Sequence, residues 1–347
     1  MSLHDTMTRF MHVFPAETAH GLALTGLKMG FGPQVPALNA PELKTHFAGL
    51  ALDHPVGLAA GFDKNGEAPD ALLNCGFAFV ELGAVTPRPQ AGNPKPRVFR
   101  LSADKAVINR MGFNNQGVEA LARRLEARKG KPGVVGINLG ANKDSADRIA
   151  DYVALLETLS GLASFFTVNI SSPNTPGLRG LQDEASLHAL LEKVNDARGA
   201  EPVFLKIAPD LDDSAIEPIL EAVRAHNLSG LVVSNTTLAR PESLKDAQAS
   251  EAGGLSGAPL FEPSTALLKA FRRAAGPALP IMGVGGISSA ETAFTKIKAG
   301  ANVVQFYSAM VYEGPGLVQR VRDGLLDLVK AEGYASIADA VGVEAGA

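Results

Sequence analysis

Eight short apolar runs alternate with amphipathic segments along this chain, and this alternation constrains the fold more than any other feature. The runs are rich in β-branched residues and fall at residues 56–60, 77–85, 134–140, 165–171, 202–208, 230–236, 280–286 and 302–308. Between them, apolar residues recur at the spacing of a half-buried helix, in patterns that begin at Val118, Ile149, Leu187 and Ile216. Strands that alternate with helices form a parallel sheet, and eight strands close into a barrel. We therefore predict a (β/α)8 TIM barrel over residues 41–347, with an open doubly wound sheet as the alternative.

Two segments fall outside the alternation. The segment RVFRLSADKAVIN (97–109) interrupts the second repeat and predicts a β-hairpin. Residues 1–40 precede the barrel as a small helical extension, in which the first helix ends at Pro15 and the second covers residues 22–29. The first helix would present one apolar face, made of Met7, Phe10, Met11 and Phe14.

Composition excludes several classes of protein. The net charge is −4 with no block of like charge, so we expect no nucleic-acid surface. A single cysteine, Cys75, rules out a disulfide framework or a cysteine-built metal cluster, and we predict it to be a buried core residue and expect no metal site. No run approaches the roughly 18 uncharged apolar residues that span a bilayer, and Asp5 and Glu17 argue against a secretion signal. The chain should neither span a membrane nor be exported, although it could lie on a membrane surface.

Polar and glycine residues collect where the predicted strands end, for example at Gly61, Lys64, Asn138, Lys206 and Asn235. In a barrel the carboxyl ends of all strands meet on one rim, where the loops form the active site. This placement favours an enzyme.

A phosphate site is predicted at GVGGISSAE (283–291), where glycines follow a strand and precede a helix. Ser288 and Glu291 have the spacing of a capping box at the start of that helix. The eighth run ends in FYS (306–308) and would complete the site. The alternative is a simple tight turn.

Lys206 ends the fifth strand inside an apolar run, where a charge needs compensation. It could form a Schiff base, lie as a cation beside an electron-rich cofactor, or belong to a structural salt bridge. Lys64 at the end of the first strand allows the same interpretations and suits a carboxylate or a flavin edge.

The segment NISSPNTPGLRG (169–180) ends a strand in two hydroxyls and contains glycines that could hinge a lid. No histidine lies near enough in the sequence to activate Ser172 as a nucleophile, so a role in proton transfer through a relay such as Thr175 is the functional interpretation, and a turn serine is the alternative. Neutral amides at the rim suit a ligand rich in C=O and N–H groups, such as a flavin or a pyrimidine. They are Asn109, Asn138, Asn169, Asn174 and Asn235.

Taken together, these segments resemble the dihydroorotate dehydrogenases over essentially the whole chain in colinear order. The resemblance is carried by residues 59–72 (AAGFDKNGEAPDAL), 86–101, 109–117 (NRMGFNNQG), 169–179 (NISSPNTPGLR), 234–237, 253–257, 283–287 and 305–308.

The resemblance implies FMN as the cofactor and dihydroorotate or orotate as the bound substrate or product. FMN would lie on Ala60, Gly61, Lys64, Ala84, Asn138, Asn169, Lys206, Ser234, Gly257, Gly286, Tyr307 and Ser308. Dihydroorotate would be held by Lys64, Asn109, Arg110, Met111, Gly112, Phe113, Asn169, Asn174, Asn235 and Thr236. At position 84 the family usually carries a threonine that contacts the flavin, so Ala84 is a departure that removes one hydroxyl contact.

Ser172 matches the catalytic base of the family. Thr175, as the proton relay, and Lys206, as the cation that stabilises the reduced flavin, are the other predicted catalytic residues. Ser172 would remove a proton from C5 of dihydroorotate while hydride passes from C6 to the flavin, which gives orotate for pyrimidine (UMP) biosynthesis. The soluble branch has cysteine at this position, so serine and the extension indicate the quinone-dependent branch.

His20 and Arg100 then match residues near a quinone site, although His20 by itself would read as a surface histidine. Residues 1–40 would form the quinone entrance of a monomeric, peripheral protein on the cytoplasmic face of a bacterial inner membrane. Two other functions compete: a phosphate-binding lyase or isomerase without flavin, and a catalytically silent barrel that serves as a scaffold.

Overall fold

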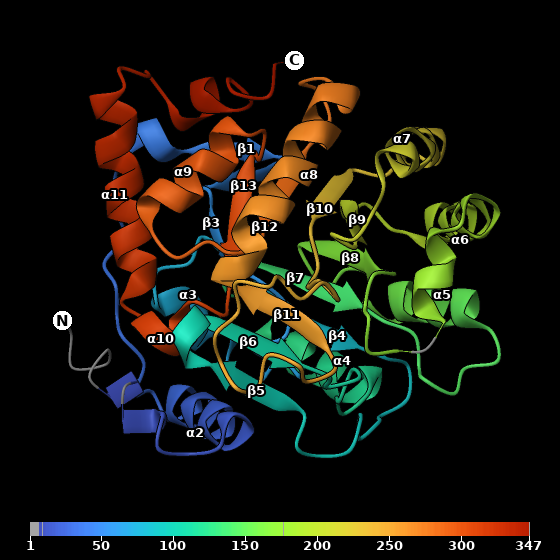
Figure 1. The fold of residues 1–347 in the computed structure, drawn as a ribbon. Helices are drawn as coiled ribbons and strands as arrows, with labels where there is room; N and C mark the ends of the chain where they lie inside the picture. The colour runs from blue at the N-terminus through green and yellow to red at the C-terminus, as the bar shows by residue number, and fades with distance from the viewer. Residues whose placement is uncertain (1–6, 9, 176, 347) are drawn as a thin grey trace.

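A closed barrel of eight parallel strands forms the centre of the molecule, as predicted (Figure 1). The computed structural model describes residues 7–8, 10–175 and 177–346, so part of the predicted extension lies outside the described residues. In chain order the barrel strands are β3 (Val56–Leu58), β4 (Phe79–Val85), β7 (Val134–Leu139), β8 (Phe165–Asn169), β9 (Val203–Ile207), β10 (Gly230–Val233), β12 (Ile281–Val284) and β13 (Val303–Phe306). The last strand pairs with the first, Val304 beside Val56, and this pairing rules out the open sheet.

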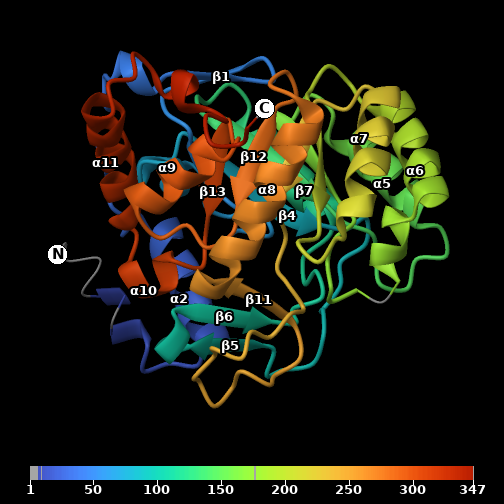
Figure 2. The same cartoon turned by 45° about the horizontal axis from the view of Figure 1, so that its top comes forward.

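Helices surround the barrel on its outer face (Figures 1 and 2). They are α3 (Pro69–Asn74), α4 (Val118–Arg128), α5 (Arg148–Leu159), α6 (Glu184–Ala197), α7 (Ile216–Ala225), α8 (Phe261–Ala275), α9 (Ala290–Lys298), α10 (Met310–Glu313) and α11 (Leu317–Ala331). Short 3-10 turns lie at Pro41–Leu43, Ser102–Asp104, Leu178–Gln182, Asp213–Ala215, Ala258–Leu260 and Ile337–Ala340. The four predicted helical patterns correspond to α4, α5, α6 and α7, whose apolar stripes are buried against the strands.

The start of α9 corrects one prediction. The capping residue is Ser289, whose hydroxyl accepts a hydrogen bond from the N–H of Thr292. The Thr292 hydroxyl in turn accepts one from the N–H of Ser289. The predicted pair of Ser288 and Glu291 is therefore wrong by one residue. The Thr292 hydroxyl provides the return hydrogen bond that was assigned to a carboxylate.

Aromatic rings fill the amino-terminal half of the barrel. Phe79 and Phe165 project inward, and a Cβ at the facing glycines, Gly57 and Gly136, would overlap these rings at 2.1–2.6 Å. A hairpin that the sequence analysis did not predict, β1 (Thr45–Phe47) with β2 (Leu50–Leu52), closes this end, and its Phe47 stacks on Phe204 at 5.0 Å. Since this end is packed with rings, only the opposite end can admit a ligand.

The predicted hairpin is confirmed as β5 (Val98–Leu101) and β6 (Ala106–Asn109), which pair antiparallel. A third strand, β11 (Gly254–Gly257), joins β6 from about 150 residues further along the chain. This three-stranded sheet lies beside the carboxyl ends of the barrel strands (Figure 1). The segment GGLSG had been recognised only as part of the resemblance and not as a strand.

In the N-terminal region, residues 7–8 and 10–11 are helical, and α2 (Ala16–Lys28) follows Pro15. The α2 helix packs against β5 and α3, close to the three-stranded sheet (Figures 1 and 2). Residues 35–40 run along the barrel: the Val35 N–H bonds to Asn74, and the Pro36 carbonyl accepts from Arg322. None of the helices in the described part of the chain is long and apolar enough to cross a bilayer.

The predicted apolar face of the first helix is divided. Met7 and Met11 line the central cavity, whereas Phe10 is 67% exposed and Phe14 lies beyond the helical residues. Exposed apolar side chains continue along the same region at Val13, Leu22, Met29 and Phe31.

Candidate active site

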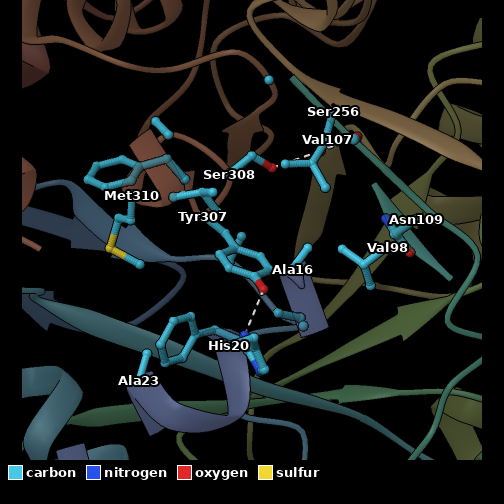
Figure 3. Close-up of a pocket in the computed structure, with 18 of the residues that line it drawn as sticks. Ala16, His20, Ala23, Val98, Val107, Asn109, Ser256, Tyr307, Ser308 and Met310 are labelled. Atoms are coloured by element: carbon cyan, nitrogen blue, oxygen red, sulfur yellow. Dashed lines mark hydrogen bonds between the residues drawn. The ribbon is translucent and has the colours of Figure 1, made fainter. Parts of the chain in front are cut away.

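One cavity of about 600 Å³ lies between the carboxyl ends of the barrel strands, the β5–β6–β11 sheet and α2. Figure 3 shows side chains from α2, from the sheet and from the end of β13 that line it. Every residue predicted to hold FMN lines this cavity: Ala60, Gly61, Lys64, Ala84, Asn138, Asn169, Lys206, Ser234, Gly257, Gly286, Tyr307 and Ser308. Its size is that of a typical cofactor or substrate site.

Most residues predicted to hold dihydroorotate line the same cavity: Lys64, Asn109, Met111, Gly112, Phe113, Asn169, Asn174, Asn235 and Thr236. The side chain of Arg110 does not. It pairs with Glu251 at 2.7 Å and lies over the Phe99 ring at 4.5 Å from the centroid. Thr175 is buried but is also absent from the lining.

A chain of side-chain amides crosses the floor of the cavity. Asn235 Nδ2 donates to Asn169 Oδ1 at 3.2 Å, and Asn169 Nδ2 donates to Asn138 Oδ1 at 2.9 Å. Asn138 Nδ2 in turn donates to Glu81 Oε1 at 2.7 Å. A carboxylate only accepts hydrogen bonds, so Glu81 fixes which way each amide along the chain points. The floor therefore presents an ordered set of donors and acceptors.

Glu81 is a residue that the sequence analysis missed. It is fully buried inside the barrel, where Gln305 Nε2 also donates to it at 2.7 Å. Burial lowers the pKa of the nearby Lys206 ammonium, and the negative charge of Glu81 opposes that shift. The sequence does carry a signal for Glu81, because it is a charged residue within the apolar run FAFVELGAV (77–85). Like Lys206, a charge in such a run needs a compensating partner.

Lys64 lies at the end of the first strand, where its ammonium donates to the Gly61 carbonyl at 2.7 Å. Burial lowers the pKa of Lys64 to about 8, while Asp63 and Glu17 raise it. A buried ammonium that retains positive charge and lines the cavity suits an anionic ligand group.

Ser172 and its loop form one wall of the cavity. Ser172 is buried, and its hydroxyl accepts the N–H of Asn174 at 3.3 Å. Arg179 holds the loop from behind, since its guanidinium donates to the Ser171 carbonyl and pairs with Asp210 at 3.0 Å. Ser172, the predicted base, thus lies at the cavity surface.

The predicted phosphate loop contains two glycines at which any side chain would be strained. Gly285 and Gly286 both have positive φ, +114° and +74°, and a Cβ on Gly286 would lie 2.4 Å from the Phe261 backbone. The Ser308 hydroxyl bonds to Ser256 at 2.7 Å and so joins the end of β13 to β11 (Figure 3). Free backbone N–H groups at such a close approach are suited to a phosphate.

At the α2 end of the cavity, His20 Nδ1 and the Tyr307 hydroxyl are hydrogen-bonded at 3.0 Å (Figure 3). Burial and the charge of Lys64 lower the pKa of His20 to about 3, so the imidazole is neutral. Arg100 also lines the cavity and donates to the carbonyls of Met11, His12 and Phe14 at the end of the first helix.

Cys75 is 2% exposed, and burial raises the pKa of its thiol to about 12, which confirms the prediction of a core cysteine. Among the described residues no cluster of three or more histidine, cysteine or acidic side chains could hold a metal ion.

A (β/α)8 barrel with a cavity at the carboxyl ends of its strands, lined by amide and lysine side chains as well as apolar ones, has the architecture of a barrel enzyme. The sequence profile of the dihydroorotate dehydrogenase family matches residues 42–329. The chain belongs to the dihydroorotate dehydrogenase family. This confirms the resemblance, the fold class and the assignment as an oxidoreductase.

Individual relatives agree along nearly the full length. Two proteins named dihydroorotate dehydrogenase (quinone) are from Allorhizobium ampelinum, 57% identical over 96% of this chain and 95% of the relative, and from Parvibaculum lavamentivorans, 54% identical over 99% of both. A crystal structure of DHODH in complex with ferulenol from Eimeria tenella superposes with a TM-score of 0.91 at 37% identity, over 94% of this chain and 95% of the other.

Proposed function

We propose that this protein oxidises (S)-dihydroorotate to orotate in pyrimidine biosynthesis, with FMN as the hydride acceptor and a membrane quinone as the final electron acceptor. One observation carries the proposal. A single cavity joins an amide-rich floor, which includes Asn138 and Asn169, to an apolar end between the N-terminal helices, lined by Met7, Met11 and Leu27. A polar substrate and an apolar oxidant therefore each have a matching surface in the same space.

The residues present fit FMN. The loop at Gly285 and Gly286 brings backbone close to the cavity where a Cβ would collide, as a phosphate requires. The amide chain and Lys206 would hold the isoalloxazine edge, because a flavin is rich in C=O and N–H groups. Bound FMN supplies a two-electron acceptor. Lys206 would stabilise the negative charge that reduction places near it, and the negative charge of Glu81 opposes the downward shift that burial causes in the Lys206 pKa.

Ser172 would take the proton that leaves the substrate. Its hydroxyl lines the cavity and is held by Asn174, which together with Asn109 would also position the pyrimidine ring. The high intrinsic pKa of a serine means that the proton must move on, and we propose Thr175, a buried residue of the same loop, as the relay. Lys64 would pair with the substrate carboxylate.

The extension would admit the quinone. His20 and Arg100 line the cavity where α2 meets the barrel, and the neutral imidazole of His20 can hydrogen-bond a quinone oxygen without carrying charge into an apolar channel. Exposed Phe10, Val13 and Leu22 would dip into the bilayer interface. We propose a monomer attached peripherally to the cytoplasmic face of a bacterial inner membrane.

Separating the two half-reactions tests the function. The purified protein should be yellow, and anaerobic dihydroorotate should bleach its flavin absorbance. A long-chain quinone added afterwards should restore the absorbance, which is the ping-pong order expected when both reactants use one flavin. Colourless protein that takes up no FMN on reconstitution would sink the proposal.

A further inference from the structure

Lys296 is a buried lysine that takes no part in the proposed reaction. It lies on α9, and its side chain is fully buried, as are those of Ala293, Phe294 and Ile297 on the same helix. A buried lysine is destabilising unless its charge is compensated. Glu262, the acidic residue whose charge it feels, lies exposed on α8.

The Lys296 ammonium is connected to the glycine loop. Lys296 Nζ donates to Ser264 Oγ at 2.5 Å. The Ser264 hydroxyl donates to the Leu260 carbonyl at 2.6 Å, and its oxygen also lies 3.3 Å from the Gly285 carbonyl. The ammonium also lies over the Phe261 ring, 5.3 Å from its centroid. Phe261 is the residue against which Gly286 packs so closely that a Cβ would not fit. The loop, the first turn of α8 and Lys296 therefore form one packed unit.

Peptide geometry then orients the loop. In a planar trans peptide the C=O and the following N–H point in opposite directions. The Gly285 carbonyl points toward Ser264, so the Gly286 N–H points the other way, and Gly286 lines the cavity. Positive charge behind the carbonyl end polarises this peptide and makes the N–H at its other end a stronger donor.

We propose that Lys296 is a positioning residue for the phosphate of the cofactor, acting from behind the loop through Ser264 and the Gly285–Gly286 peptide. The inference rests on FMN being the cofactor of the proposed function. The Lys296 charge would not contact FMN, but it would favour binding of the dianionic phosphate. Burial lowers the pKa of Lys296 to about 7, so a nearby anion would hold the ammonium in its charged form.

The test compares two flavins that differ only in the phosphate. Riboflavin is added to the yellow holoprotein, the protein is separated by gel filtration, and the bound ratio of FMN to riboflavin is measured. Lys296→Met keeps an unbranched side chain of similar length and removes the charge. The preference for FMN should fall about 10- to 100-fold, the effect of losing one interaction with a charged group. Riboflavin binding should stay the same, which a general loss of structure would not allow.

Lys298→Met is the matched control. Lys298 is on the same helix but pairs with Glu332 and Glu344 at the surface, so its loss should leave the preference unchanged. If Lys296→Met does not fold, Ser264→Ala breaks the same connection and should also reduce the preference. An unchanged FMN preference, or equal losses of both flavins, in the variant that folds would overturn the inference. A parent protein that binds no FMN would instead overturn the proposed function.

Discussion

Replacing Glu81 separates the contribution of its charge from that of its hydrogen bonds. Glu81 accepts two buried amide donors, Asn138 and Gln305, each at 2.7 Å. Glu81→Ala leaves both donors unsatisfied and Lys206 without its buried counter-charge, and removing one partner of a buried charged group costs about 3–5 kcal/mol. Unfolding entropy of about 2.1 cal/mol/K per residue, over 347 residues, converts this loss into a Tm decrease of about 4–7 °C.

Glu81→Gln should be much milder for stability. The NH2 group introduced at position 81 would face the NH2 group of Gln305. The Gln305 amide can rotate, however, so that its Oε1, which is buried without a partner, accepts a hydrogen bond from the new NH2 group. One rotated amide thus repairs the network, and the decrease in stability should be about 1 kcal/mol, or 1–2 °C. The two variants can be compared by calorimetry of the holoprotein.

Both variants should affect the chemistry in a pH-dependent way. Glu81 opposes the downward shift of the Lys206 pKa, so its removal lowers that pKa further. Lys206 then loses its proton at a lower pH, and the rate of flavin reduction by dihydroorotate should fall most at alkaline pH and approach the parent rate at acidic pH. Stopped-flow measurements across the pH range check this. A uniform slowing at every pH, or a Glu81→Gln protein as unstable as Glu81→Ala, would refute the reasoning.

Three further outcomes follow. Ser172→Ala should slow flavin reduction about 10²- to 10⁴-fold while the flavin stays bound. Ser172→Cys should restore part of the rate, with a pH dependence near the cysteine pKa of about 8.5. If stopped-flow reduction of the alanine variant runs at the parent rate, Ser172 is not the base. Deleting residues 1–33, which keeps the bonds of Val35 and Pro36 to the barrel, should leave dihydroorotate able to bleach the flavin but sharply reduce quinone reoxidation and vesicle binding. Unchanged quinone turnover would mean that the segment is not the entrance. Burial lowers the pKa of His54 from 6.5 to about 4. Below pH 6.5 the unfolded chain therefore binds a proton that the native protein does not, and stability is lost as the pH falls toward 4. His54→Gln should flatten the pH dependence of the denaturation midpoint between pH 6.5 and 4; the same pH dependence in both proteins would contradict this role of His54.

Much of the fold and site could be predicted because the relevant signals are local. Burial of both faces makes the barrel strands continuous apolar runs, and each run ends where polar residues begin. The carboxyl ends of parallel strands must share one rim, so Asn138, Asn169, Lys206 and Asn235 could be placed together before any contact was known. Their roles in binding and catalysis stay predictions.

Other features could not be predicted because they depend on pairings between distant segments. Strand β11 joins β6 across about 150 residues, and nothing within GGLSG specifies that partner. Thr292 replaced Glu291 in the helix cap because the chain enters α9 one residue later than the spacing suggested. The Arg110 side chain lies next to residues that line the cavity, but it turns to Glu251 on another loop.

By itself, then, the sequence determined the alternation of strands and helices, the rim and the family, since each is encoded by hydrophobic period or by contiguous motifs. Only the tertiary structure decided which charges share a low-dielectric interior. It placed Glu81 inside the barrel near Lys206, and it placed Lys296 behind the Gly285–Gly286 loop. It also decided that α2 would dock on β5, with Glu17 paired at 2.7 Å to Arg97, the residue just before that strand. Such pairings arise only when the chain folds, because folding brings residues far apart in the sequence within reach of each other and removes the water that would otherwise screen them.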